Sequence, residues 1–294
     1  MKKGFSLVGM KNIGELERLL GCFPDAYVEL SYAMDEDLLN DVMPLVGGRI
    51  ASIHSLCPRR EFFPNFASSD EAVISWSEKE LMKDAAFALS IGAEILVLHP
   101  GYLLPSLIPS DKNRRIEALS SPSLEQYIGI RDGSICCNDY IFTPVYRRTF
   151  SLMCRNLRGM NRKLSDMGIR LALENLNPRA GYMLIHPDEM VALSRSEDFY
   201  FTLDIGHLYV SAELFGFDFL SGLKKVLDTG RVVTTHLHSN PSSRRKGLFT
   251  DSHQSLDGFS MPYEASLSLI ERSGANMMLE VVDSIEHNLC FLFP

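Results

Sequence analysis

Eight short apolar runs, each separated from the next by a segment of helical character, restrict the fold more than any other feature of this chain. They are FSLVG near residue 5, AYVELS near 28, RIASIHS near 51, EILVLHP near 96, RLALENL near 172, FYFTLD near 201, VVTTHLH near 235 and NMMLEVV near 279. Strand and helix patterns that alternate in this way predict a parallel sheet. Eight alternations in 294 residues predict an α/β fold with a single (β/α)8 TIM barrel spanning residues 1–294.

Two long segments illustrate the helical pattern between the strands. Residues 71–92 and 145–168 each end at a glycine, which suits the C-terminal cap of a helix. A doubly wound sheet is the alternative fold for such a chain. That fold usually has fewer strands and a Gly-rich phosphate turn, and no G-x-G-x-x-G motif follows any of the eight runs. The barrel is therefore favoured.

One connection departs from the regular alternation. Residues 101 to about 145, after the fourth run, are too long for an ordinary loop between a strand and a helix. Connections of this length are usually lids, binding loops or small subdomains. In a barrel this insertion would follow the carboxyl end of the fourth strand, and we expect it to stand over the face where such barrels hold their active sites.

Charge and hydropathy limit the classes of partner. A formal net charge of −8 argues against nucleic-acid binding through bulk charge. No apolar stretch reaches the roughly 18 residues of a membrane-spanning helix, and the first residues do not form a signal peptide. The six cysteines are scattered without C-x-x-C spacing, as is typical of reduced thiols. We therefore expect a cytoplasmic protein without a membrane partner; a homo-oligomer is compatible with the sequence.

Ionisable side chains end seven of the eight runs. They are Glu29, His54, His99, Glu174, Asp204 with His207 just after it, His236 with His238, and Glu280. Each one alone has a structural explanation, such as a hydrogen-bonded core histidine or an ion pair at the barrel rim. Together they would converge on one face of a barrel, where burying so many charges without a cation would be costly. Carboxylate and imidazole ligands suit zinc, manganese, cobalt or magnesium.

These residues lie in segments that carry a family resemblance. SIHS, LVLHPG, LALENL, TLDIGH, THLHSN, DSHQSLDG and LEVV, in this order, resemble the xylose isomerase-like TIM-barrel superfamily, which contains sugar and sugar-phosphate isomerases and epimerases as well as endonuclease IV. The resemblance covers nearly the whole chain. It implies a shared metal site formed by Glu174, Asp204, His236 and Glu280. It also implies additional metal ligands at the positions that match endonuclease IV, which are His54, His99, His207, Asp251 and His253.

The resemblance supports a sugar or sugar-phosphate isomerase or epimerase with one divalent ion. Glu174 and Glu280 would be its catalytic residues, because one carboxylate can remove a proton beside a carbonyl and the other can return it through an ene-diolate. Glu29, His238, Arg244 and Arg245 would bind the substrate, with the two arginines contacting a phosphate if the sugar carries one. The alternative interpretation of the SSRRK segment, which contains these arginines, is a solvated loop, and such loops are the more common case.

The alternative is an endonuclease IV-like zinc phosphodiesterase that acts on abasic DNA with up to three ions. Here His207, Asp251 and His253 would hold a third ion, whereas in the isomerase His207 could contact substrate or simply bond to Asp204. Basic groups at Arg59-Arg60, Arg114-Arg115 and Arg244-Arg245-Lys246 lie in the expected loops of the catalytic face and could follow a phosphate backbone. A metal-binding barrel without catalysis is the third hypothesis.

Overall fold

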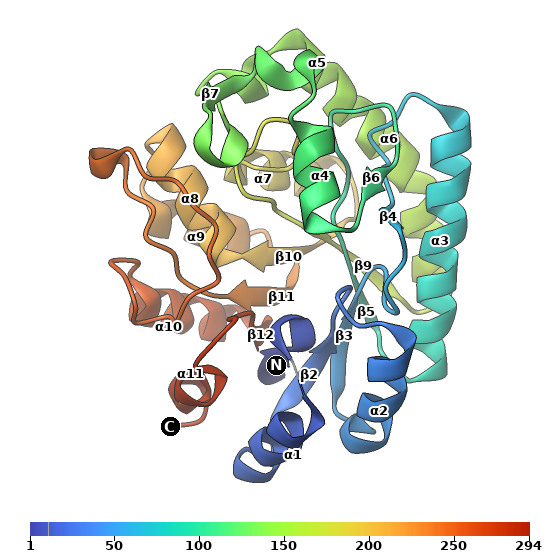
Figure 1. Cartoon of the computed structure of the whole chain (residues 1–294), viewed down its shortest axis with the longest axis vertical. Coiled ribbons are helices and arrows are strands. Elements are labelled where there is room, and N and C mark those ends of the chain that lie inside the picture. The colour runs from blue at the N-terminus through green and yellow to red at the C-terminus, as the bar shows by residue number, and fades with distance from the viewer. Residues whose placement is uncertain (11) are drawn as a thin grey trace.

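Eight parallel strands close into a barrel in this computed structural model, which describes residues 1–10 and 12–294 (Figure 1). Around the barrel the strands follow the order β1, β12, β11, β10, β9, β5, β3 and β2. Their bounds are β1 (Lys3–Ser6), β2 (Tyr27–Leu30), β3 (Ile50–His54), β5 (Ile95–Leu98), β9 (Arg170–Glu174), β10 (Tyr200–Asp204), β11 (Val232–Leu237) and β12 (Asn276–Leu279). Each strand coincides with one of the eight apolar runs, so the predicted TIM barrel is confirmed.

Helices cover the outside of the barrel and connect each strand to the next. They are α1 (Ile13–Cys22), α2 (Glu36–Val46), α3 (Glu71–Ser90), α6 (Pro144–Asp166), α7 (Pro187–Ser196), α8 (Ile205–Phe215), α9 (Phe219–Leu227), α10 (Tyr263–Ser273) and α11 (Ile285–Leu292). The predicted C-terminal glycines, Gly92 and Gly168, both adopt positive φ just past α3 and α6. No helix in the described part of the chain is long and apolar enough to cross a membrane.

Side chains inside the barrel change character along the strands. Ile95 and Val97 of β5 and Ala172 of β9 form a small apolar cluster that is separate from the main core. Their neighbours Leu96 and Leu98 belong instead to the main core, as expected when successive side chains of a strand point to opposite faces. Glu174 is two residues beyond Ala172, so it continues the inward row. The interior is therefore apolar where the strands begin and ionisable where they end.

The connection between β5 and α6 contains several short elements. They are β6 (Ile108–Pro109), α4 (Lys112–Leu119), α5 (Pro122–Glu125), β7 (Ile128–Ile130), β8 (Ile135–Cys136) and two 3-10 turns, η2 (Asp132–Ser134) and η3 (Tyr140–Phe142). β6 pairs antiparallel with β4 (Phe62–Phe63), which lies between β3 and α3. In Figure 1 the green elements α4, α5 and β7 lie together at the top of the view. The first residues of the connection are closely packed against the segment before α3, because a Cβ on Gly101 would lie 2.7 Å from the Cβ of Ala67.

Candidate metal centre

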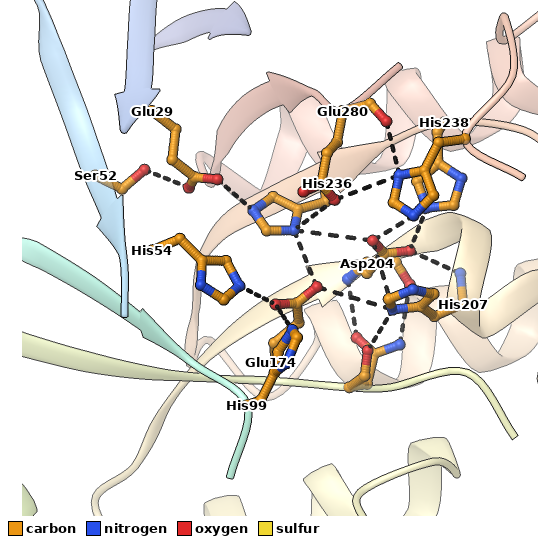
Figure 2. Close-up of polar contacts among 12 residues, drawn as sticks. Glu29, Ser52, His54, His99, Glu174, Asp204, His207, His236, His238 and Glu280 are labelled. Atoms are coloured by element: carbon orange, nitrogen blue, oxygen red, sulfur yellow. Dashed lines mark hydrogen bonds and ion pairs between the residues drawn. The ribbon is translucent and has the colours of Figure 1, made fainter. Parts of the chain in front are cut away.

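The strand-end side chains meet at the carboxyl end of the barrel (Figure 2). Glu29, His54, Glu174, Asp204 and His236 lie within the last residues of β2, β3, β9, β10 and β11. His99, His238 and Glu280 follow β5, β11 and β12 directly, His207 lies in the first turn of α8, and Asp251 with His253 comes from the loop before α10. Every residue predicted as a metal ligand is thus part of one cluster.

The central group consists of Glu174, Asp204, His236 and Glu280, all buried. His236 Nδ1 lies 3.1 Å from Glu174 Oε1, 3.2 Å from Glu280 Oε2 and 3.8 Å from Asp204 Oδ2. One imidazole nitrogen therefore faces three carboxylates from three other strands. This is the set of four residues that the family resemblance implies as the shared metal site.

Glu29 approaches the same imidazole from the opposite side. Its Oε1 lies 2.9 Å from His236 Nε2, and Ser52 donates a 2.6 Å hydrogen bond to Glu29 Oε2. The Glu29 and His236 atoms are close but not aligned for hydrogen bonding, so both are buried without a hydrogen-bond partner. Glu29 therefore contacts the central group through His236, and its carboxylate lies between Ser52 and His236 (Figure 2).

A second group lies on the β3 and β5 side of Glu174. His54 Nε2 is 3.2 Å and His99 Nε2 is 3.3 Å from Glu174 Oε2, and the three residues satisfy the spacing of a metal site. The other oxygen of Glu174 faces His236, at 3.1 Å. Glu174 is consequently shared between this group and the central one.

A third group lies on the α8 side and contains His207, His238, Asp251 and His253. His207 Nε2 and His253 Nε2 lie 3.2 Å from the two different oxygens of Asp251. His238 Nε2 is 4.0 Å from Asp251 but only 3.0 Å from Asp204. His238 therefore links the third group to the central one.

The absence of a side chain at Gly206 leaves space for the His238 ring. A Cβ at Gly206 would lie 2.0 Å from His238 Cε1, closer than two such atoms can approach. The His238 ring also stacks on His253, with centroids 3.9 Å apart and planes 14° from parallel. The glycine of the TLDIGH segment is thus required by packing within the cluster.

Hydrogen bonds orient the histidines of the two outer groups. The Nδ1 atoms of His54, His207 and His253 lie 3.1, 2.9 and 2.8 Å from the backbone carbonyls of Ser55, Asn175 and Glu280. A carbonyl can only accept, so each Nδ1 carries the proton and donates it when the ring is neutral. The Nε2 lone pair then points toward the carboxylates, which is the usual arrangement of metal-binding histidines.

Charges in the cluster shift the pKa values in opposite directions. Burial would raise the pKa of Glu280, but the charge and hydrogen bond of His236 lower it to about 2. Burial would lower the pKa of His207, but Asp204 and Asp251 raise it to about 10. At His99 burial prevails and lowers the pKa to about 4, despite Glu174. Neighbouring histidines likewise lower the pKa values of Glu174 and Asp251 against the effect of burial. These three carboxylates are therefore ionised, and they require positive charge nearby.

The donor set fits divalent ions. Four ligand atoms about 2.1 Å from a tetrahedral zinc ion would lie about 3.4 Å apart, and the closest donor pairs of the three groups are separated by 3.1 to 3.3 Å. Within each group all ligand atoms lie within 4.8 Å of one another. Asp251 Oδ1 is buried without a hydrogen-bond partner, as is typical of an atom that needs a cation or another ligand.

Two asparagines beside Glu174 were not predicted from the sequence. Asn175 accepts a hydrogen bond from Asp204 N–H at 2.9 Å and donates one to the Asp204 carbonyl at 3.0 Å. Asn177 donates to Asp251 Oδ2 at 2.7 Å. Asn175 thus fixes the end of β10, and Asn177 fixes Asp251 in the loop before α10. The signal was present in the ENLN segment, where both follow a predicted ligand within three residues.

Arg244 and Arg245 lie away from the three groups. Both are exposed in the turn η4 (Arg244–Lys246). A Cβ on Gly216, at the C-terminal end of α8, would lie 1.9 Å from Arg244 Nη1, which places the guanidinium over that helix end. Their predicted role in substrate binding stays a prediction.

The comparisons with known proteins agree with this architecture. A family model described as xylose isomerase-like TIM barrel matches residues 29–288. No curated protein matches the sequence significantly. A D-tagatose 3-epimerase-like protein is similar in structure, with a TM-score of 0.65 and 17% identity over 100% of this chain and 96% of that chain.

Two further solved structures are similar at comparable levels. One is an AP endonuclease, family 2, from Brucella melitensis, with a TM-score of 0.62 and 18% identity over 100% of this chain and 98% of that chain. The other is a 3-keto-D-glucoside 4-epimerase from E. coli, with a TM-score of 0.62 and 12% identity over 100% and 98% of the two chains. At such identities the similarity concerns the fold.

Proposed function

The chain belongs to the xylose isomerase-like TIM barrel family, and on this basis we propose that it is a divalent-metal-dependent isomerase or epimerase of a sugar or sugar phosphate. The observation that carries the proposal is the central group, in which Glu174 Oε1 and Glu280 Oε2 both lie beside His236 Nδ1, at 3.1 and 3.2 Å. Isomerisation or epimerisation beside a carbonyl needs two proton-transfer groups on either side of one carbon skeleton. Two of the similar structures are named as an epimerase or epimerase-like.

The two glutamates differ in how many contacts they already make. Both oxygens of Glu174 face histidines, His54 and His99 on one side and His236 on the other. Glu280 is engaged through Oε2 alone, by His236 and His253. The Oε1 atom of Glu280 is therefore free to accept a substrate proton. We assign Glu280 to one proton transfer and Glu174 to the transfer at the other face or the neighbouring carbon.

Other residues of the cluster would bind and orient the substrate. Glu174, Asp204, His236 and Glu280 would hold the ion, which when bound supplies Lewis-acid stabilisation of negative charge on oxygen. His99 has a side chain that is 17% exposed and could donate to or accept from a substrate hydroxyl. Glu29 is fully buried behind His236, so its role would be to orient that imidazole. His238 is likewise fully buried and could act through Asp204.

A zinc phosphodiesterase acting on abasic DNA is the second candidate, favoured by three adjacent groups of donors. Two of the groups share Glu174, and His238 links the third group to Asp204 of the central group. Hydrolases that cleave phosphodiesters use two or three ions a few ångströms apart to clamp the attacking and leaving oxygens. Each group has three or four donors spaced so that they could hold an ion. The second candidate therefore differs from the first in the number of ions that are needed for activity.

Metal content per chain tests the two candidates against each other. We would purify the protein without chelator or affinity metal and measure the ions by mass spectrometry. About one ion, particularly manganese, cobalt or magnesium, together with turnover of a ketose or ketose phosphate, would support the isomerase or epimerase. About three zinc ions and cleavage of DNA with an abasic site would support the phosphodiesterase. Bound metal without either activity would favour a non-catalytic metal-binding barrel.

A further inference from the structure

Arg115 differs from the neighbouring arginines Arg59, Arg60 and Arg114 because no carboxylate pairs with it. Arg59 lies 3.9 Å from Asp111, and Arg114 lies 3.1 Å from Glu61. Arg60 is bonded to both Glu80 and Asp84. For Arg115 the described residues provide no such partner, although its side chain is half-buried. A half-buried guanidinium without a counter-ion has charge available for an anionic ligand.

The position of Arg115 is set by contacts within the insertion and by an aromatic ring. Arg115 is in the first turns of α4, next to β6, which pairs with β4 (Figure 1). Its Nη1 donates to the carbonyl of Ser110 at 2.8 Å, and its Cζ lies 5.1 Å from the ring centroid of Phe63. Nε and Nη2 donate to no carbonyl or carboxylate of the described residues. The guanidinium is therefore fixed through Nη1, whereas Nε and Nη2 remain available to a ligand.

Phe63 connects this guanidinium to the metal centre. Its ring centroid lies 5.2 Å from that of His99 and 5.3 Å from that of Tyr32. His99 in turn lies 3.3 Å from Glu174, and the Tyr32 ring packs on His54 with centroids 4.9 Å apart. Arg115 is thus separated from the histidines of the second group by a single aromatic layer.

Tyrosines complete the surroundings of Arg115. The ring centroids of Tyr32 and Tyr102 lie 5.3 and 6.4 Å from that of Phe63, and the Tyr182 ring lies 5.4 Å from that of Tyr102. Burial would lower the pKa of Arg115, but Tyr182, Tyr102 and Tyr32 raise it, Tyr182 also through a hydrogen bond. Tyr102 is occupied, since its hydroxyl lies 3.2 Å from His99 Nδ1. The hydroxyl of Tyr182 is within hydrogen-bonding reach of the Arg115 guanidinium, and the hydroxyl of Tyr32 bonds to no described residue. Together with Nε and Nη2 they provide several donors around one positive charge.

We propose that Arg115, Tyr32 and Tyr182 form an anion subsite that binds the phosphate of a phosphorylated sugar, beside the His54 and His99 side of the metal centre. This inference rests on the proposed isomerase or epimerase function and narrows its substrate to a phosphate monoester. A terminal phosphate has three oxygens that accept hydrogen bonds, which matches a guanidinium fork plus two hydroxyls better than the two oxygens of a carboxylate do. It also assigns phosphate binding to the insertion rather than to Arg244 and Arg245.

Inorganic phosphate is the first probe, because its binding does not depend on turnover. We would measure its dissociation constant by calorimetry for the metal-loaded wild type, Arg115→Gln and Arg114→Gln. Arg114 is the matched control, since it is the adjacent arginine of the same helix and its guanidinium pairs with Glu61. Loss of charge-assisted hydrogen bonds should weaken binding about tenfold or more in Arg115→Gln alone. Equal affinity in wild type and Arg115→Gln would overturn the subsite.

The variant Arg115→Lys distinguishes a direct loss of phosphate binding from a loss caused by misfolding. It keeps the charge but loses the fork, so phosphate affinity should lie between those of the wild type and Arg115→Gln. Circular dichroism and metal content should match the wild type in all variants. If Arg115→Gln weakens phosphate binding only because the insertion is disordered, Arg115→Lys would show the same disorder and the same loss, which would count against the subsite.

Kinetics then separate the subsite from the proposed function. For a ketose phosphate, Arg115→Gln should raise KM about tenfold or more, while kcat/KM for the unphosphorylated ketose stays within about twofold. Phosphate binding that depends on Arg115, in a protein that turns over no ketose phosphate, would support the subsite and contradict the isomerase. Turnover of ketose phosphates with unchanged KM in Arg115→Gln would support the isomerase and contradict the subsite.

Discussion

Two glutamates in different regions of this molecule have opposite pKa shifts. Glu280, beside β12 in the metal centre, has a pKa lowered to about 2, whereas Glu189, in the first turn of α7, has a pKa raised to about 7. Burial is the largest influence at both and would raise the pKa of either carboxyl. The difference must therefore come from the groups that surround each carboxylate.

The partners of Glu189 are neutral and those of Glu280 can carry charge. Glu189 accepts hydrogen bonds from Tyr146 Oη at 2.6 Å and from the N–H groups of Ile185 and His186 at 2.9 and 2.8 Å. Glu280 instead lies 3.2 Å from His236. Three neutral donors do not offset the desolvation of Glu189, but an adjacent positive charge does so for Glu280. The strand-end cluster is thus suited to ionised carboxylates in a way that the start of α7 is not.

Replacing each glutamate with glutamine should give the largest difference in activity between the two positions. Glu280→Gln removes a proton-transfer group and a charge that contacts His236, so we expect turnover to fall by about 10²–10⁴-fold with an unchanged circular dichroism spectrum. Glu189→Gln is the matched control and should keep nearly full turnover. Steady-state kinetics on the same substrate measure both. If Glu280→Gln kept more than about a tenth of the wild-type activity, the assignment of Glu280 would be wrong.

Removing metal tests the same cluster through stability. A ligand present at a thousand times its Kd stabilises the folded state by about 4 kcal/mol, so chelation should lower the free energy of unfolding by a similar amount. Urea unfolding with and without a chelator measures this loss. Because Glu189 lies outside the three groups, Glu189→Gln should show the same loss on chelation. Identical unfolding curves with and without chelator, in protein shown to contain metal beforehand, would contradict a tightly bound ion.

Much of the site could be predicted because ligands at strand ends are local features of the sequence. Glu174 and Asp204 each end an apolar run, and a closed barrel brings all such ends to one face. The contacts of Arg115 could not be predicted in this way. They depend on the pairing of β4 with β6, two residues each, which brings Phe63 beside α4. Such short strands have no distinctive pattern in the sequence.

The same distinction applies to the two glutamates. The sequence marks Glu280 because it follows a strand of the barrel, among other candidate ligands. It marks Glu189 only as an acidic residue in the first turn of a helix, where it forms a capping box with His186. Its high pKa results from burial against Tyr146, 43 positions earlier in the chain. Long-range packing of this kind cannot be derived from local spacing.

The raised pKa of Glu189 should make the stability of the protein depend on pH. Its pKa is raised in the folded state from 4.5 to about 7, so its contribution is fully present below about pH 4.5 and is lost as the pH rises through 7. The total change is up to about 3 kcal/mol. Other groups also titrate in this range. The informative quantity is therefore the difference in the free energy of unfolding between wild type and Glu189→Gln, measured by urea unfolding from pH 4.5 to 8. A difference that does not vary with pH would show that folding does not raise the pKa of Glu189.

His253→Ala should have the smallest effect if the central group performs the chemistry. His253 contacts Asp251 in the third group at 3.2 Å and reaches Glu280 Oε2 only at 3.7 Å. For an isomerase with one essential ion we expect a loss of less than about tenfold in kcat/KM, or about 1.4 kcal/mol. The control is His287→Ala, which changes an exposed histidine paired with Asp257 outside the cluster.

Metal content and rate in His253→Ala, measured on one preparation, decide between the two candidate functions. The loss of one ion with little loss of rate would mean that the third group is dispensable for turnover, as the isomerase or epimerase requires. A loss as large as that of Glu280→Gln, accompanied by loss of metal, would mean that the groups act together. That result would favour the phosphodiesterase, because ions that clamp one phosphodiester depend on each other, whereas proton transfer between Glu174 and Glu280 needs the central group alone.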